Sequence, residues 1–240
     1  HAIGDYIMFS DADDTMPNGA LQDLWNHTDK NVDIVAGTIL YETKKYHIIS
    51  QTEKSVIDNS EYIHLLLNRK TYFGPCSKLI RRILFDKFSW NEDSDVFLHE
   101  DLLMLVELAA KCKGNIAISN NYVHYVCFDK EGSLSTRKMS FEGWKKVFEG
   151  VRHVVSTIKQ PSLYSDYVNY VILNIYDGFI TQAKNIPQDD FVMSLLRESK
   201  QSDIQPGNKK VYRLISKPYL RSIFCLYRSV RIFFRKLIKE

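Results

Sequence analysis

Three carboxylates are clustered directly after the first apolar run of the sequence. Residues 6–10 form this strand-like run, and Asp11, Asp13 and Asp14 follow it. Open α/β sheets bind their ligands beyond the carboxyl ends of their strands. Neighbouring carboxylates repel one another, and a bound Mg²⁺ or Mn²⁺ relieves that repulsion. Because Mg²⁺ takes only one or two carboxylates, it can also bridge to a substrate diphosphate. The cluster therefore predicts a metal on Asp11 and Asp13, with Asp14 beside the bound cofactor.

A helix cap, a calcium loop or a phosphatase nucleophile loop could also account for this cluster. Asp14 or Thr15 could cap the helix that follows, although a cap needs one such residue and the segment holds four. A calcium loop would require Gly and Glu where this sequence has Met16 and Gln22, which excludes it. The spacing Asp11-x-Asp13-x-Thr15 also resembles the nucleophile loop of haloacid-dehalogenase-type phosphatases, but the later Gly-Asp pair of that family is absent. A phosphatase remains the alternative enzyme.

Four motifs in order resemble family 2 glycosyltransferases. Residues 4–14 resemble the family's GDYIxFxDxDD signature, and residues 77–82 are similar to its xKLxRR segment. His99-Glu100-Asp101 resembles the (G)ED catalytic motif, and residues 132–135 match GSxS. The resemblance covers residues 1 to about 140. The family's opening strands, which hold the nucleotide base, do not precede residue 4, so the resemblance implies an incomplete domain.

This resemblance implies a fold, a reaction and a set of site residues. The fold is α/β, a Rossmann-like A-type nucleotide-diphospho-sugar transferase domain. The reaction is inverting transfer of a sugar from a nucleotide-sugar donor to an acceptor hydroxyl, in polysaccharide or glycolipid synthesis. Mn²⁺ or Mg²⁺ neutralises the leaving diphosphate. Asp101 is the general base and Glu100 orients it or the acceptor. The substrate-binding residues are Lys78, His99, His124 and Ser133.

Asp101 and Glu100 also have a purely structural interpretation. They open a helical pattern over residues 100–113, where the helix macrodipole favours acidic side chains. The same effect predicts that Asp101 is ionised at neutral pH. For Arg81 and Arg82, a solvated face of a short basic helix over residues 78–85 is expected. A hydrogen-bonded structural role is the alternative for His99 and His124.

The apolar patterns predict the elements that position these residues. After the strand at 6–10 and a helix from Pro17, strands are expected at 32–41 and 46–51. A helix over 60–69 follows, and strands at 116–118 and 122–128 flank a turn at Asn120-Asn121. Beyond residue 140 the pattern is helical. We therefore expect a catalytic domain over 1–138 and an α-helical extension over 139–240.

The C-terminal segment is strongly basic and amphipathic. Residues 209–240 contain ten Lys or Arg and a single acid, whereas the whole chain has a net charge of only +3. Such a helix is typical of anionic membrane surfaces, where a lipid-linked acceptor would be found. Packing on the chain itself or in a homodimer is the alternative. A nucleic-acid arm comes third, so nucleic acid is not among the predicted partners.

The compartment is predicted from the cysteines and from hydropathy. The four cysteines are scattered, with no C-x-x-C pair, so neither a disulfide framework nor a zinc site is indicated. No run of eighteen uncharged apolar residues occurs. We expect a cytoplasmic protein, peripheral on the inner face of the membrane. A non-catalytic membrane or partner-binding module is the third functional alternative.

Overall fold

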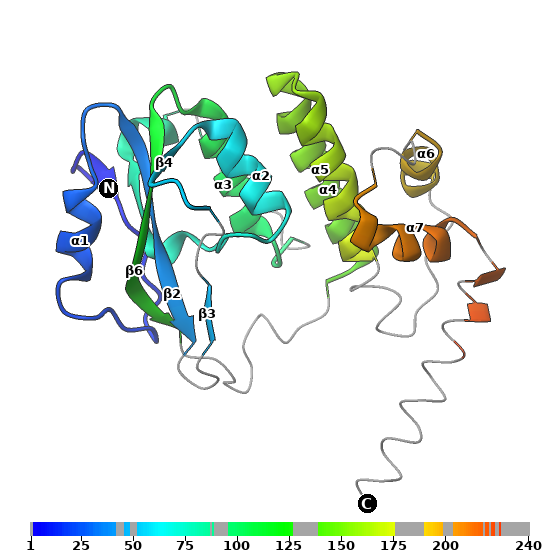
Figure 1. Ribbon diagram of the computed structural model, residues 1–240, viewed down its shortest axis with the longest axis horizontal. Helices are drawn as coiled ribbons and strands as arrows, with labels where there is room; N and C mark the ends of the chain where they lie inside the picture. The colour runs from blue at the N-terminus through cyan, green and yellow to red at the C-terminus, as the bar shows by residue number, and fades with distance from the viewer. Residues whose placement is uncertain are drawn as a thin grey trace, which may run out of the picture. The chain divides into compact units, whose positions relative to one another are not determined.

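Figure 1 shows a computed structural model of the chain, which forms two compact units, residues 1–163 and 164–240. The predicted boundary near residue 138 stays a prediction. The structure describes residues 2–41, 46–48, 52–86, 88, 96–126, 139–175, 190–198, 204–217, 219–220, 222–223 and 226.

A mixed sheet lies at the centre of the first unit. Its strand order is β1-β5-β2-β6-β4, with β3 paired to β2. Strands β2 and β6 are parallel, and the other described pairs are antiparallel. The strands are β1 (Tyr6–Ile7), β2 (Val32–Tyr41), β3 (Tyr46–Ile48), β4 (Val56–Ile57), β5 (Lys78–Arg81) and β6 (Asn115–Val126).

Helices cover both faces of this sheet (Figure 1). Helix α1 (Ala20–Asn26) packs on β2, β5 and β6, whereas α2 (Asn59–Leu67) contacts β6 and α3 (Glu100–Lys111). Helix α4 (Phe141–Ile158) packs on α3, and α5 (Pro161–Ile175) follows it. The second unit contains α6 (Asp190–Glu198) and α7 (Lys209–Ser216). The predicted α/β class with helices after the sheet is confirmed. No helix in the described ranges is both long and apolar enough to span a bilayer.

The two central strands are buried on both faces, as a parallel pair covered by helices requires. Ile34 of β2 lies level with Ile80 on β5 and Ile116 on β6, and all three side chains are fully buried. On the face toward α1, Val35 packs with Leu24. This double burial explains why residues 32–41 read as a near-continuous apolar run.

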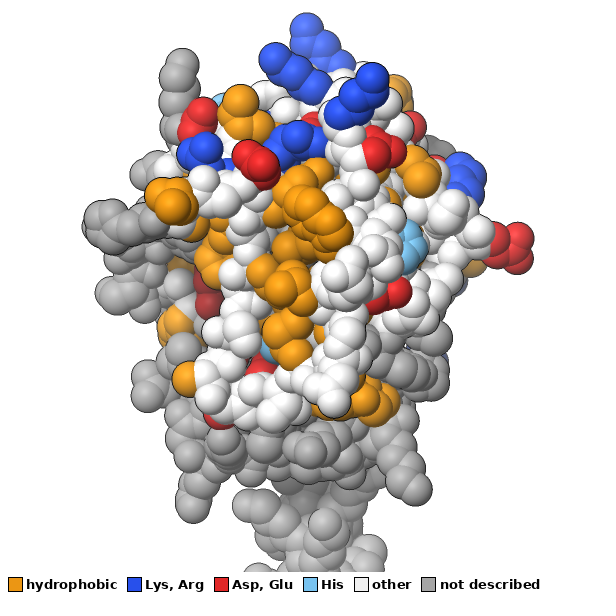
Figure 2. All heavy atoms as spheres, turned by 90° about the vertical axis from the view of Figure 1, so that its left-hand side faces the viewer, with side chains coloured by type: hydrophobic (Ala, Val, Ile, Leu, Met, Phe, Trp, Pro, Cys, Tyr) orange, Lys and Arg blue, Asp and Glu red, His pale blue; other side chains and the backbone are white. Residues whose placement is uncertain are grey.

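The outer face of α1 remains apolar. Figure 2 shows hydrophobic side chains gathered in a strip on the side of the molecule where α1 lies. Leu21 and Trp25 are more than half exposed there. The Trp25 ring meets the edge of the Tyr6 ring at 6.1 Å between centroids. Trp25 therefore shields Tyr6 of the edge strand β1 from solvent.

The predicted basic helix over residues 78–85 is wrong. Residues 78–81 form β5, between β1 and β2, and a 3₁₀ turn follows at Arg82–Phe85. Lys78, Leu79 and Ile80 are all buried in the sheet. Hydrogen bonding to two neighbouring strands outweighs the intrinsic helix preference of Lys, Leu and Arg.

The predicted turn at Asn120-Asn121 is instead a bulge within one strand, β6. Ala36 pairs with Ile118 and Thr38 with Tyr122, so Gly37 alone faces three residues of β6. The bulge is held from α1. Oδ2 of Asp23 accepts a hydrogen bond from the Ser119 hydroxyl at 2.6 Å. Polar residues whose sequence pattern predicts a turn therefore form a bulge that is hydrogen-bonded to helix α1.

Gly37 allows the strand, the bulge and α1 to approach one another. A Cβ at this position would lie 2.3 Å from Cγ2 of Val123 and 3.1 Å from both Cδ2 of Leu24 and the carbonyl oxygen of Ser77. Contacts of that length force neighbouring groups to move. Glycine is needed here for space.

We predict that Gly37→Ala lowers the free energy of unfolding by about 1–3 kcal/mol, because it overpacks this contact. Val123→Ala combined with Gly37→Ala should recover part of that loss. Gly207→Ala is the matched control, since nothing lies within 4 Å of a Cβ there. Urea denaturation of the four proteins measures the effect, and equal stabilities for the Gly37 and Gly207 variants would contradict it.

Candidate active site

The acidic loop after β1 is fixed to the end of β6 by backbone hydrogen bonds. The Thr15 amide donates to the Tyr125 carbonyl at 3.1 Å, and the Tyr125 amide donates back at 2.8 Å. Within the loop, the Asp14 amide donates to the Asp11 carbonyl at 3.3 Å. Asp11 and Asp13 are exposed on this turn. The backbone thus presents two carboxylates to solvent at the carboxyl end of a strand.

Asp14 faces the protein. Its Oδ2 lies 2.8 Å from Nε2 of His124 on β6, and the two side chains are 5% and 0% exposed. Nδ1 of His124 is buried and has no hydrogen-bond partner among the described residues. This pair is a second attachment between the loop and β6. His124 therefore lies behind the acidic loop, in contact with its third carboxylate.

The capping interpretation of the cluster is wrong. Helix α1 begins at Ala20, and its N-cap position is Gly19, in the left-handed region at φ 83°. Neither Asp14 nor Thr15 therefore occupies the cap position.

Arg81 fixes β1 and β5 to the start of β2. Its guanidinium lies 3.1 Å from Oδ1 of Asp33 and donates to the Tyr6 hydroxyl at 3.0 Å and to the Val32 carbonyl at 2.8 Å. The expectation of a solvated Arg81 is wrong for this reason. Arg82 is exposed as expected, yet its Nε donates to the Gly4 carbonyl at 2.8 Å.

Asp33 is the partner that sequence reasoning missed. It is buried in β2, and Oδ2 accepts the backbone amides of Lys113 and Gly114 at 2.9 and 2.7 Å. The available signal was an acid inside an apolar run, since a buried carboxylate requires a cation and donors. Asp33 thereby joins β2, β5 and the α3–β6 connection.

Asp101 is held at the start of α3. The pKa of its carboxyl is raised to about 7, first by burial and then by the charge of Glu100, while the Lys78 ammonium lowers it and Asp11 adds a smaller increase. Desolvation thus opposes the helix N-terminus, which the sequence predicted to favour the ionised form of Asp101 at neutral pH.

Lys78 lies beneath this site and is not on the surface. Its side chain is fully buried, and Nζ donates to the Gly74 carbonyl at 2.6 Å and to the Ser77 hydroxyl at 3.2 Å. Burial lowers the pKa of the ammonium to about 7, while Asp101 raises it. In this position the charge of Lys78 lowers the pKa of Asp101.

His99 occupies an aromatic environment at the start of α3. Its ring lies 5.0 Å from the Phe73 ring and 4.9 Å from the Trp144 ring, between centroids. Burial, with a smaller effect of Arg69, lowers its pKa to about 4. His99 is thus neutral at pH 7, and its backbone adopts the left-handed conformation at φ 63°.

Two predicted features are not visible in this geometry. Ser133 lies outside the described residues. Among the residues that are described, no three His, Cys, Asp or Glu side chains gather as a complete metal centre would require. The predicted metal site on Asp11 and Asp13 stays a prediction.

Comparisons with known proteins agree with this arrangement. Residues 1–89 match the family model described as Glycosyl transferase family 2. The matched segment contains the acidic loop, β2 and β5, which are three parts of the site described above. Glycosyl transfer in general is the chemistry that this match supports. No curated protein sequence matches the chain.

Solved structures of TarS from S. aureus have the same fold. TarS 1–349 in complex with UDP-GlcNAc aligns with a TM-score of 0.65 and 13% identity over 98% of this chain and 69% of that chain. Its complex with UDP aligns with a TM-score of 0.56 and 13% identity, over 98% and 68% of the two chains. The predicted A-type glycosyltransferase fold is confirmed.

We predict that Asp14→Ala lowers the free energy of unfolding by about 1–3 kcal/mol, because it leaves the buried imidazole of His124 without its partner. Asp86→Ala removes the same charge from an exposed position and should change stability by less than about 0.5 kcal/mol. Chemical denaturation compares the two variants. Equal losses would show that the buried pair does not hold the loop.

We also predict that the free energy of unfolding of Asp101→Asn, relative to that of wild type, increases as pH rises. The ordinary pKa of an aspartate is 3.8, and that of folded Asp101 is about 7. Between these two pKa values, Asp101 is deprotonated in the unfolded chain and still protonated in the folded chain. The stability of wild type therefore falls with rising pH, whereas that of the variant does not change at this position.

The measurement is urea denaturation of wild type and Asp101→Asn from pH 4 to 8, with exposed Asp86→Asn as the control. The stability gained by Asp101→Asn should grow up to about pH 7 and then level off. A difference that is independent of pH would contradict the raised pKa.

Proposed function

We propose that this chain transfers a sugar from a nucleoside-diphosphate sugar to an acceptor hydroxyl with inversion. The observation that carries the proposal is the acidic turn after β1, which is fixed to β6 and lies within the residues that match the glycosyltransferase family model. It supports a single site in which a carboxylate loop for the diphosphate lies near a buried carboxyl for the acceptor.

Asp101 is the proposed general base. A base is most effective when its pKa lies near the working pH, and the value of about 7 meets that condition. The carboxylate accepts the proton of the acceptor hydroxyl as that oxygen attacks the anomeric carbon. Glu100 and Lys78 are positioning residues, since their opposite charges set the pKa of Asp101 from either side.

Asp11 and Asp13 are the proposed ligands of a divalent metal and its diphosphate. Both are exposed carboxylates on a fixed turn, and oxygen donors suit Mg²⁺ and Mn²⁺. Two protein ligands fit Mg²⁺, which completes its shell with water and substrate phosphate oxygens. When bound, the ion would supply positive charge for the leaving diphosphate. Asp14, paired with His124, positions the turn.

The donor and acceptor follow from the same chemistry. Uridine-diphosphate sugars are the first donors to test, because the similar TarS structures hold UDP-GlcNAc and UDP. We propose a glycan or lipid-linked acceptor, in polysaccharide or glycolipid synthesis on the cytoplasmic face of a membrane. A homodimer through residues 209–240 is the alternative to membrane contact.

We predict that Asp101→Asn lowers kcat by roughly 10²–10⁴ and leaves donor affinity unchanged, because only the base is removed. Turnover and donor binding are measured on the same preparation, with Asp86→Asn as the control. The rate should rise with pH as Asp101 loses its proton near pH 7. Wild-type turnover in Asp101→Asn would contradict this role.

The same assay separates the phosphatase alternative. A transferase releases nucleoside diphosphate from the donor, whereas a phosphatase would release inorganic phosphate from a phosphomonoester. Activity only on the phosphomonoester would overturn the proposal, and activity on neither substrate would favour a binding module.

A further inference from the structure

The second unit contains a surface hollow that is lined by cations and apolar side chains. It has a volume of about 720 Å³ and is formed by Pro206, Lys209, Lys210, Val211, Arg213, Leu214 and Leu220. Ligand pockets commonly measure about 300–1,000 Å³. Every lining residue belongs to α7 or its flanking turns, so the hollow is formed within one unit.

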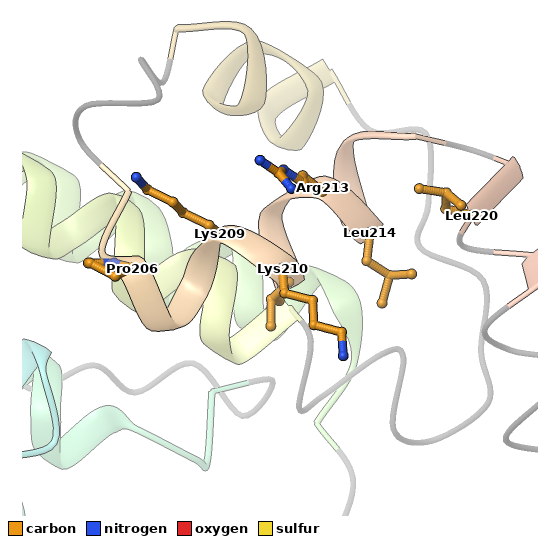
Figure 3. A pocket seen from close by; sticks show the side chains of 7 residues that line it. Pro206, Lys209, Lys210, Arg213, Leu214 and Leu220 are labelled. Carbon is orange, nitrogen blue, oxygen red and sulfur yellow. The ribbon is translucent and has the colours of Figure 1, made fainter.

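The cations of this hollow are available to a ligand. Figure 3 shows Lys209 and Arg213 on one side of α7 in this view and Lys210 on the other. Lys209, Lys210 and Arg213 are exposed. None of these three forms an ion pair with a residue in the described part of the chain. Three cations on one turn of helix repel one another, so an anion would relieve that repulsion.

Exposed apolar side chains follow directly after the hollow. Tyr219, Ile223 and Leu226 are 60%, 62% and 68% exposed. Their spacing of four and then three residues places them on one side of a helical pattern. Large apolar side chains beside such a group of cations are the pattern of a segment that lies in a membrane interface.

We propose that this hollow binds the phosphate headgroup of an anionic phospholipid, with Tyr219, Ile223 and Leu226 inserted beside it. Lys209 and Arg213, on one side of α7, would contact the phosphate, and Lys210 on the other side would add to the attraction of the anionic surface. Leu214 and Leu220 would contact the first part of the acyl chain. The aliphatic stems of the lysines suit this arrangement, since they cover apolar surface and keep the charge in water. The site goes beyond the proposed sugar transfer and does not depend on it.

The test is co-sedimentation of the full chain with phosphatidylcholine vesicles that do or do not contain phosphatidylglycerol. Binding is expected only with phosphatidylglycerol, and salt should weaken it. Combining Lys209→Gln, Lys210→Gln and Arg213→Gln should weaken it on the order of 100-fold, because each cation near an anionic surface contributes about a fivefold effect.

A matched triple variant distinguishes binding at the hollow from a general effect of net charge on vesicle binding. Lys30→Gln, Lys113→Gln and Lys159→Gln remove the same charge from exposed positions of the first unit and should leave binding nearly unchanged. Leu220→Gln should weaken binding about tenfold without changing charge. If the α7 triple variant does not fold, Lys210→Gln alone should still weaken binding roughly fivefold.

Four results would overturn the proposal. They are equal losses in both triple variants, absence of vesicle binding at low salt, glycerol phosphate binding to the protein as tightly as the vesicles do, or loss of self-association in the α7 variant without any vesicle binding. Sedimentation does not depend on sugar chemistry. A negative result therefore leaves the proposed transferase untouched, and an inactive transferase leaves this test intact.

Discussion

The buried contact between Asp14 and His124 is the interaction on which the site depends. Asp11 and Asp13 lie on a turn whose carboxylates repel one another, and such a turn moves away from its neighbours unless the fold holds it. The 2.8 Å contact with a fully buried imidazole, together with the paired backbone bonds of Thr15 and Tyr125, fixes it against β6. Removing one partner of a buried pair costs more than the pair contributes, so this anchor resists change.

A second anchor fixes the strand that precedes the turn. Strand β1 has only two residues and lies at the edge of the described sheet, where backbone pairing alone holds it weakly. Arg81 adds contacts to Tyr6, Val32 and Asp33, and Asp33 extends them to the start of β6. The turn is thus held at both ends, and preorganised charges of this kind need no rearrangement during reaction.

The site is formed at a cost in stability. Desolvation of the half-buried Asp101 carboxyl and the charge of Glu100 raise its pKa, which disfavours the ionised form on folding, and the Lys78 ammonium opposes this only in part. Burying Lys78 likewise lowers the pKa of its ammonium to about 7. A core chosen for stability alone would place apolar side chains at both positions. Strained electrostatics of this kind are concentrated at functional sites.

The sequence predicted those parts of the molecule that depend on local pattern. Strand β2 and the start of α3 follow from apolar periodicity and from acids at a helix N-terminus, and the acidic turn follows from its motif. Lys78 in β5, the bulge at residues 119–121 and the role of Arg81 depend on partners 42 to 98 residues away, such as Ala36 for Lys78 and Asp23 for Asn121. No local pattern contains that information, because neighbouring strands and a buried acid decide these positions.

The central claim is that the acidic turn and Asp101 form one site, and a carboxyl NMR titration of Asp101 tests it most directly. With ¹³C-labelled aspartate, wild type should show Asp101 titrating near pH 7. In Asp11→Asn the same resonance should titrate at lower pH, because the negative charge that raises the pKa has been removed. Asp86→Asn should leave it unchanged. A pKa of Asp101 near its ordinary value, or one that Asp11→Asn does not alter, would contradict the account.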